Sequence, residues 1–289
     1  MKISEIQFID GATGSELERR GVDLSLPLWS TRALIDAPEV LAEVHRDYLT
    51  AGSQAITAAT FRTHRRCLEK VGLGDRCGEL TRLALQIARD ARDELCPDAL
   101  VLGSVAPLED CYRPDLVPDT DICRREHSEL IGNLMNAGAD LILIETMNQL
   151  GEARAAMQAA QQIAPGRWLI SFCLDEDHPG VLLSGESLAS LEEPLSEASA
   201  VGVNCVAAGS MQSQVRWLRD LLPSTPLLAY GNIGHADPQG KWLSTDAVCP
   251  GDYLTHARCW VEAGGNIIGG CCGTTPDHIR LLTREVHQW

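Results

Sequence analysis

The segment Leu141-Ile142-Leu143-Ile144-Glu145-Thr146 decides the fold class of this chain. Its first four residues are all large and apolar, and no polar residue alternates with them. A strand that has one face in water alternates, whereas a strand of a parallel sheet is covered on both faces and does not. The segment therefore predicts a buried parallel strand that ends in a carboxylate, Glu145.

Short apolar runs of this kind recur eight times along the 289 residues, separated by longer amphipathic segments. The expected strands span residues 6–9, 54–58, 100–105, 141–144, 168–172, 201–206, 227–230 and 266–268. The expected helices span residues 38–51, 78–95, 119–137, 149–163, 187–200, 211–222, 252–263 and 276–287. Each strand–helix pair has about the size of one βαβ module. Eight modules predict a (β/α)8 TIM barrel of the α/β class, with an open doubly wound sheet as the alternative.

The chain shows no sign of a division into domains. No stretch rich in Pro, Gly or Ser interrupts the alternation, so we expect one barrel domain over residues 1–289. Gly52, Gly138 and Gly264 each follow an expected helix, where a left-handed cap favours glycine. Strand, helix and cap signals thus agree along most of the sequence.

The composition excludes several classes of partner. The chain has 40 acidic against 24 basic residues, a formal charge of −16, which disfavours nucleic acids and anionic membrane surfaces. We find no signal peptide and no apolar stretch long enough to cross a membrane, so a cytoplasmic location is expected. Eleven cysteines, an odd number, then indicate reduced thiols and no disulfide framework.

In a barrel, reactive side chains lie at the carboxyl ends of the strands. Four of the expected strands end in segments that carry chemistry: Asp10-Gly11-Ala12-Thr13-Gly14, Glu145-Thr146, Asn204-Cys205 and Gly269-Gly270-Cys271-Cys272-Gly273. Three cysteines and two carboxylates would therefore surround one mouth of the barrel.

Three thiolates that converge on one point favour zinc, which three protein ligands bind with one position left open. The candidate ligands are Cys205, Cys271 and Cys272, and the flanking glycines allow the backbone to bend between the adjacent pair. Spacing alone leaves a second interpretation open, namely three buried and inert thiols, because no CxxC pair or HExxH helix is present. The other cysteines are expected to be structural: Cys67, Cys77, Cys96, Cys111, Cys123, Cys173, Cys249 and Cys259.

Three of these segments together resemble the homocysteine S-methyltransferase family, and the similarity runs from Phe8 to about Leu282. They are Asp10-Gly11-Ala12-Thr13-Gly14, Gly202-Val203-Asn204-Cys205 and Gly269-Gly270-Cys271-Cys272-Gly273-Thr274-Thr275-Pro276. The resemblance implies a barrel in which Cys205, Cys271 and Cys272 hold a catalytic zinc ion. It also implies that the thiol of homocysteine takes the fourth position, where the cation ionises it.

The same resemblance assigns substrate-binding residues. It implies that Asp10 and Glu145 bind the ammonium group of homocysteine, which suits carboxylates at strand ends. The alternatives are an ordinary turn at Asp10 and a salt-bridge partner at Glu145. Gly11 and Asn204 are expected to contact the substrate, with Asn204 either holding its carboxylate or orienting Cys205.

His64 is a separate case, because it follows the second expected strand beside Arg62, Arg65 and Arg66. We expect a solvated loop histidine at the start of a solvated basic helix. The alternative is a temporary zinc ligand, the role implied for a tyrosine near this position in betaine-using relatives. The basic cluster itself is an alternative contact for a substrate carboxylate.

Two loops depart from the family pattern and leave the methyl donor open. Ala106-Pro107-Leu108 stands where relatives that use S-methylmethionine carry Gly-Pro-Tyr, and Tyr230-Gly231-Asn232 stands where they carry Tyr-Pro-Asn. A chain of this length carries no folate or cobalamin module, so the expected donor is a sulfonium, S-methylmethionine or S-adenosylmethionine.

The expected function is therefore zinc-dependent methyl transfer from that donor to homocysteine, giving methionine. The alternatives are betaine as donor, another thiol or selenol as acceptor, and a zinc-binding barrel with a structural or binding role. The expected partners are small-molecule substrates, and the sequence does not indicate an oligomeric state.

Overall fold

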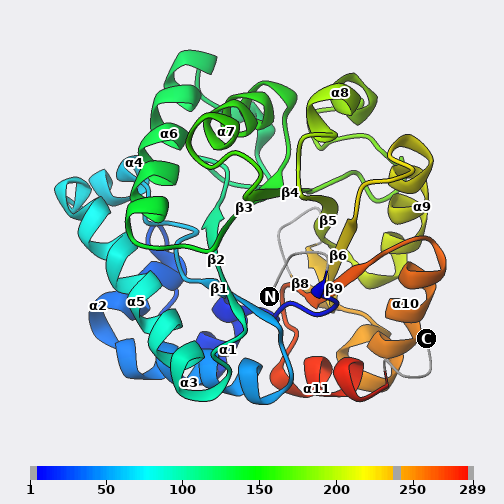
Figure 1. The fold of residues 1–289 in the computed structure, drawn as a ribbon, viewed down its shortest axis with the longest axis horizontal. Helices are drawn as coiled ribbons and strands as arrows, with labels where there is room; N and C mark the ends of the chain where they lie inside the picture. The colour runs from blue at the N-terminus through cyan, green and yellow to red at the C-terminus, as the bar shows by residue number, and fades with distance from the viewer. Residues whose placement is uncertain (1–4, 237–241, 286–289) are drawn as a thin grey trace.

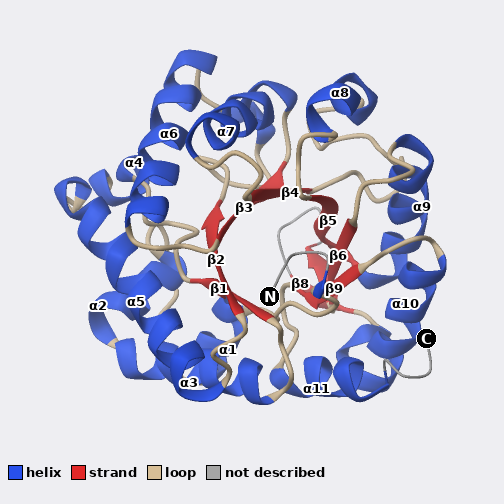
Figure 2. Cartoon of the chain, viewed as in Figure 1, coloured by secondary structure: helices blue, strands red, loops and turns tan. Residues whose placement is uncertain are grey.

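The computed structural model describes residues 5–236 and 242–285 of the chain. Seven parallel strands curl into a cylinder, and the helices surround it on the outside (Figure 1, Figure 2). The strands are hydrogen-bonded in the order β1 (Ala55–Ala58), β2 (Leu100–Val105), β3 (Leu141–Met147), β4 (Trp168–Phe172), β5 (Ala200–Ala207), β6 (Leu227–Asn232) and β9 (Ile267–Gly270). A separate antiparallel pair consists of β7 (Gly234–Ala236) and β8 (Trp242–Ser244).

The first expected strand is present only as two bridging residues, and these close the cylinder. Phe8 pairs in parallel with Ile268 of β9, and Ile9 pairs in parallel with Ala55 of β1. The Ile9 amide donates to the Ile268 carbonyl at 2.9 Å, and the Asp10 amide donates to the Ala55 carbonyl at 3.1 Å. The expected (β/α)8 barrel is therefore confirmed, with its first strand shortened to this bridge.

The helices agree with most of the expected segments to within a few residues. They are α1 (Thr13–Arg19), α2 (Ala33–Asp36), α3 (Pro38–Thr50), α4 (Arg65–Glu69), α5 (Cys77–Leu95), α6 (Thr120–Asn136), α7 (Leu150–Ile163), α8 (Glu192–Leu195), α9 (Met211–Leu221), α10 (Pro250–Glu262) and α11 (Pro276–Glu285). The last two residues of the expected 276–287 helix lie outside the described residues. Gly52, Gly138 and Gly264 adopt the left-handed conformation predicted for helix caps.

The expected helix over residues 187–200 is wrong. The segment forms a 3-10 turn at Leu188–Leu191 followed by the single turn of α8, and the chain enters β5 at Ala200. The backbone of Ser199 already donates to Trp168 of β4 at 2.9 Å. The two short turns bury Leu188, Leu191 and Leu195. The spacing of apolar residues alone therefore does not distinguish these turns from one long helix.

The two faces of β3 explain why its sequence does not alternate. Leu141 and Leu143 point into the barrel with the inner apolar cluster, while Ile142 and Ile144 pack against the surrounding helices. Glu145 comes next on the inward side and opens the polar mouth. Within residues 5–236 and 242–285, no helix combines the length and apolar character that a membrane crossing requires.

Candidate metal centre and substrate pocket

Three cysteine sulfurs from two distant segments meet at the barrel mouth. Cys205 lies on β5, and Cys271 and Cys272 follow β9. The Sγ atoms of Cys205 and Cys271 are 3.1 Å apart, and all three Sγ atoms lie within 4.8 Å of one another. Thiolates that share one tetrahedral zinc ion stand about 3.8 Å apart, so this group could hold a single metal ion. The predicted convergence of the three cysteines is confirmed.

Two residues with a strained backbone conformation lie where strands bulge next to this centre. Cys205 has φ 57° and Thr146 has φ 62°, a left-handed conformation that a side chain rarely adopts. Each lies at a register shift, on β5 and β3 respectively, where the strand bulges. A bulge re-aims a side chain at the cost of about 1–3 kcal/mol of strain, which persists only where neighbours enforce it.

Asn204 joins the two strained positions. Its Oδ1 accepts hydrogen bonds from the Thr146 amide at 3.0 Å and the Ser171 hydroxyl at 2.8 Å. Its Nδ2 donates to the Thr146 hydroxyl at 2.8 Å, and the side chain is fully buried. Because its amide is already occupied by protein groups, this geometry supports a role for Asn204 in orienting Cys205 more than in binding a substrate carboxylate.

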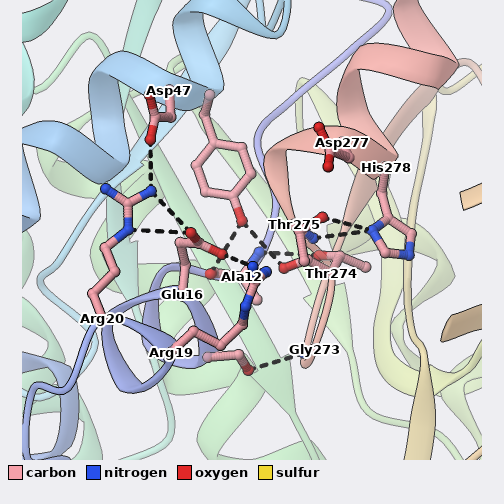
Figure 3. A network of polar contacts seen from close by, with 12 residues as sticks. Ala12, Glu16, Arg19, Arg20, Asp47, Gly273, Thr274, Thr275, Asp277 and His278 are labelled. Atoms are coloured by element: carbon pink, nitrogen blue, oxygen red, sulfur yellow. Dashed lines mark hydrogen bonds and ion pairs between the residues drawn. The ribbon is translucent and has the colours of Figure 1, made fainter.

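The loop that carries the cysteine pair is tied to the first loop of the barrel (Figure 3). The Thr274 hydroxyl donates to the Cys271 carbonyl at 2.8 Å and accepts from the Ala12 amide at 3.1 Å. The Gly273 amide donates to the Ser15 hydroxyl at 2.9 Å. The position of the cysteine pair is therefore fixed relative to the segment that contains Asp10.

A network of ion pairs and one tyrosine anchors this first loop in turn (Figure 3). Glu16 of α1 pairs with Arg20 at 2.9 Å, and Arg20 pairs with Asp47 of α3 at 2.6 Å. The Tyr48 hydroxyl lies 3.1 Å from the Ala12 carbonyl. A Cβ at the pocket-lining Gly11 would come within 2.8 Å of Tyr48, so glycine is required there for close packing.

The three thiols cannot all ionise side by side without a cation. Hydrogen bonds from Cys205 and Cys272 hold the pKa of Cys271 well below its usual range, and the same bond to Cys271 raises the pKa of Cys205. One thiolate is thus stabilised by two neighbouring thiols, in a partly buried environment that penalises further negative charge. A bound divalent cation would remove this penalty.

Two buried carboxylates line the same cavity, whose volume is about 560 Å³. Asp10 accepts from the Thr57 amide at 2.7 Å and the Thr57 hydroxyl at 3.0 Å, and burial raises its pKa to about 7. Glu145 accepts from the hydroxyls of Ser104 and Tyr230, and burial raises its pKa to about 8. Ionisation of both carboxyl groups becomes favourable when a cation such as an ammonium group enters the cavity.

His64 does not occupy the solvated position expected for it. The side chain is 2% exposed, neither ring nitrogen has a hydrogen-bond partner, and burial holds its pKa well below the usual range. The residue is also absent from the lining of the cavity and from the three-cysteine group. The expected solvated position is therefore wrong, because tertiary packing and not the basic local sequence sets the environment of this side chain.

Two cysteines expected to be structural belong to the neighbourhood of the site. Cys111 lines the cavity together with Tyr112, and the Cys173 thiol donates to the Cys205 carbonyl at 3.7 Å. Cys173 comes directly after β4, so its place at a strand end was a signal that sequence reasoning missed. Nothing in the sequence around Cys111 indicates that its loop turns back over the mouth.

The comparison with known proteins decides the family. The family model described as homocysteine S-methyltransferase matches residues 7–286. The chain belongs to the homocysteine S-methyltransferase family. It is 32% identical to the homocysteine S-methyltransferase of Escherichia coli, over 96% of this chain and 94% of that protein. It is 30% identical to a selenocysteine Se-methyltransferase of Brassica oleracea, over 96% of this chain and 88% of that protein.

A solved member of the family has the same fold. The crystal structure of the metallated form of the E. coli homocysteine methyltransferase MmuM superposes with a TM-score of 0.80. The two chains are 30% identical, and the match covers 97% of this chain and 96% of the other. Membership in the family makes this protein a methyltransferase.

Proposed function

We propose that the protein transfers a methyl group from a sulfonium donor to the thiol of homocysteine, with zinc bound by Cys205, Cys271 and Cys272, and so produces methionine. The observation that carries this proposal is the meeting of three Sγ atoms, within 4.8 Å of one another, in a cavity that Asp10 and Glu145 also line. Thiolates suit zinc, and carboxylates suit the ammonium group of an amino acid.

The residues present fit the metal. The three Sγ atoms lie within 4.8 Å of one another, which is close enough for one ion to bind all three, and thiolates are ligands that zinc favours. When bound, zinc supplies the positive charge that keeps an incoming thiol ionised at neutral pH. The thiol proton has then left before methyl transfer, so the protein needs no general base for that step.

The remaining residues bind and orient the substrates. Asp10 and Glu145 would hold the ammonium group and fix the direction of the acceptor sulfur, while Asn204 keeps Cys205 in its strained position. A sulfur lone pair then forms the new bond to the methyl carbon. The bond between that carbon and the sulfonium sulfur breaks, its electron pair stays on the leaving sulfur, and a neutral thioether departs. Alignment of this kind contributes several kcal/mol to the rate.

The outer wall of the cavity favours a cationic donor. Trp29 and Phe61 line it, with their ring centroids 5.4 Å apart in an edge-to-face pair. The Arg62 guanidinium already lies 5.5 Å from the Phe61 centroid, so Trp29 is the ring we expect a substrate cation to contact. Aromatic faces attract cations by about 0.5–2 kcal/mol. A sulfonium satisfies this wall, and so does the ammonium of betaine, which therefore belongs in any donor panel. A selenol is the second candidate acceptor, because one relative is a selenocysteine Se-methyltransferase.

The test is a methyl-transfer assay combined with metal analysis of the same sample. Wild-type protein loaded with zinc should methylate homocysteine from S-methylmethionine or S-adenosylmethionine. Cys272→Ser should lose bound zinc and at least 100-fold in turnover, whereas Cys249→Ser, which changes an exposed cysteine, should behave as wild type. Zinc retained by Cys272→Ser, or zinc-loaded wild type that methylates no thiol, contradicts the proposal.

A further inference from the structure

The segment from the end of β1 to Lys70, the residue after α4, carries four basic arginine and lysine side chains, of which three are neutralised by ion pairs. Arg65 pairs with Glu129 at 2.6 Å, Arg66 with Glu126 at 2.7 Å, and Lys70 with Glu109 at 2.6 Å. These pairs fasten α4 to α6 and to the loop that follows β2. Their charges are therefore compensated within the protein.

The fourth, Arg62, is different. Its Nη1 donates to the Glu109 carbonyl at 2.9 Å, its Cζ lies 5.5 Å from the centroid of the Phe61 ring, and its buried Nε has no hydrogen-bond partner. Among residues 5–236 and 242–285, no carboxylate forms an ion pair with it. A guanidinium carries five N–H donors and stays charged, so most of its bonding capacity is unused.

Arg62 faces the same cavity as the cysteine centre. It lines that cavity together with Phe61, Trp29 and the carboxylates Asp10 and Glu145. Asp10 and Glu145 lie at strand ends, 2% and 9% exposed, whereas Arg62 is only half-buried and follows the last residue of β1 by four positions. The cavity thus has an acidic floor beside the sulfurs, formed by Asp10 and Glu145. Its lining also includes Asp110 and the ion pair of Lys70 with Glu109, so among the described residues Arg62 is the lining cation that no carboxylate pairs with.

We propose that Arg62 binds the carboxylate of the methyl donor and so selects for it. This inference rests on the proposed function and names a specificity-determining residue of the same site. The floor takes the ammonium group of the acceptor, because the acceptor sulfur must reach the cysteines. The donor then occupies the outer half, between the aromatic pair and Arg62, where a planar guanidinium matches a carboxylate with two parallel hydrogen bonds.

The arrangement also explains why a cationic side chain is compatible with a cationic donor. The sulfonium lies toward the sulfurs, while the carboxylate at the other end of the donor neutralises Arg62. A donor without that carboxylate would leave the guanidinium unpaired and would add the positive charges of its own sulfonium and ammonium groups to that of Arg62 in one cavity. Recognition therefore depends on the carboxylate and not only on the sulfonium.

The experiment measures direct binding by calorimetry, which is independent of turnover. The zinc-loaded wild type is titrated with S-methylmethionine and with its methyl ester, which lacks the carboxylate charge. Wild type should bind S-methylmethionine at least tenfold more tightly than the ester. Arg62→Gln should lose this preference, Arg62→Lys should keep part of it, and Arg65→Gln, which changes a paired residue outside the cavity, should keep all of it.

Three results would overturn the inference: wild type that binds neither compound, wild type that binds both equally, or Arg62→Gln that retains the preference. A parallel titration with homocysteine separates the two substrates, because its affinity should be unchanged in Arg62→Gln. A loss of homocysteine affinity instead would assign Arg62 to the acceptor and contradict the proposal. Thermal unfolding of each variant identifies any that fails to fold, and Arg62→Lys then carries the test.

Failure of the proposed function gives a different pattern. In that case the wild type methylates no homocysteine with any donor, whatever the titrations show. If turnover is present and the carboxylate preference is absent, only the role of Arg62 is wrong.

Discussion

At the scale of single residues, the two buried carboxylates of the pocket are held where a negative charge is costly. Asp10 and Glu145 lose most of their hydration, and hydrogen bonds from Thr57, Ser104 and Tyr230 only partly replace it. Their pKa values, about 7 and about 8, mean that the free pocket holds protons at pH values where exposed carboxyls have lost them. An ammonium group would displace those protons.

This leads to a prediction for the metal-free and substrate-free protein. The pKa of Asp10 is raised from 3.8 to about 7, so between these values the folded state binds a proton that the unfolded state has released. The free energy of unfolding therefore falls as the pH rises through this range, and Asp10 accounts for about 2–3 kcal/mol of the loss between about pH 5 and pH 8. Asp10→Asn, which resembles the protonated acid, should show a correspondingly shallower decline.

Urea unfolding at pH 5 and pH 8 measures both proteins. Asp98→Asn, which makes the same change at an exposed acid, serves as the control and should follow the wild type. An equally steep decline in Asp10→Asn would mean that Asp10 is ionised in the empty pocket.

At the scale of elements, β5 positions Cys205 by lying very close to β6. Gly202 pairs with Leu228, and a Cβ on Gly202 would come 2.1 Å from the Leu228 carbonyl oxygen. Since the obstacle is backbone, no side-chain rearrangement can relieve it. The strand that presents Cys205 three residues later thus depends on a glycine at this point.

Gly202→Ala should therefore lower the free energy of unfolding by about 2–4 kcal/mol and displace Cys205, which would weaken metal binding as well. Urea unfolding and metal content measure the two effects. Gly132→Ala is the matched control, because Gly132 lies inside α6 with no atom within 4 Å of the added Cβ. This control should gain about 0.5–1 kcal/mol from helix propensity. A Gly202→Ala variant as stable as the wild type would show that the two strands can move apart.

The ends of helices could be predicted where the spacing of apolar residues and the capping residues indicated the same position. Helix α6 is an example, because its apolar face ends just before the left-handed Gly138. Prediction failed where different local structures bury the same residues, as in the short turns of residues 188–195. It also missed the short helix α1, whose sequence offered only the turn that begins at Asp10. Short elements are chosen by tertiary contacts, and local sequence does not encode them.

At the scale of the whole molecule, the site exists only because the barrel closes. Cys205 and Cys271 are far apart in sequence, and their meeting followed from placing both at strand ends of one predicted barrel. The same reasoning could not predict that His64 is buried, because that depends on the helices packed around it. Nor could it distinguish Arg62 from Arg65 and Arg66, since the ion pairs that neutralise the latter two come from α6 and the loop after β2.

A metal ion at this centre would connect parts of the barrel that are not adjacent in the sheet. Cys205 belongs to β5, Cys271 and Cys272 follow β9, and β6 lies between these strands. Since the unfolded chain does not assemble the site, metal binding should stabilise the fold by about 4 kcal/mol at a free metal concentration 1,000-fold above Kd. Removal of the metal with a chelator should then lower Tm by about 8–16 °C.

The same centre should lose its metal in acid, because protons compete for the thiolates. Metal content measured after equilibration should fall between about pH 7 and pH 4, and the Tm difference between metal-loaded and metal-free protein should vanish over the same range. Cys272→Ser, already unable to hold the ion, should show no such difference at any pH. Metal content that stays constant down to about pH 4 would mean that the ion is held by ligands other than these three cysteines.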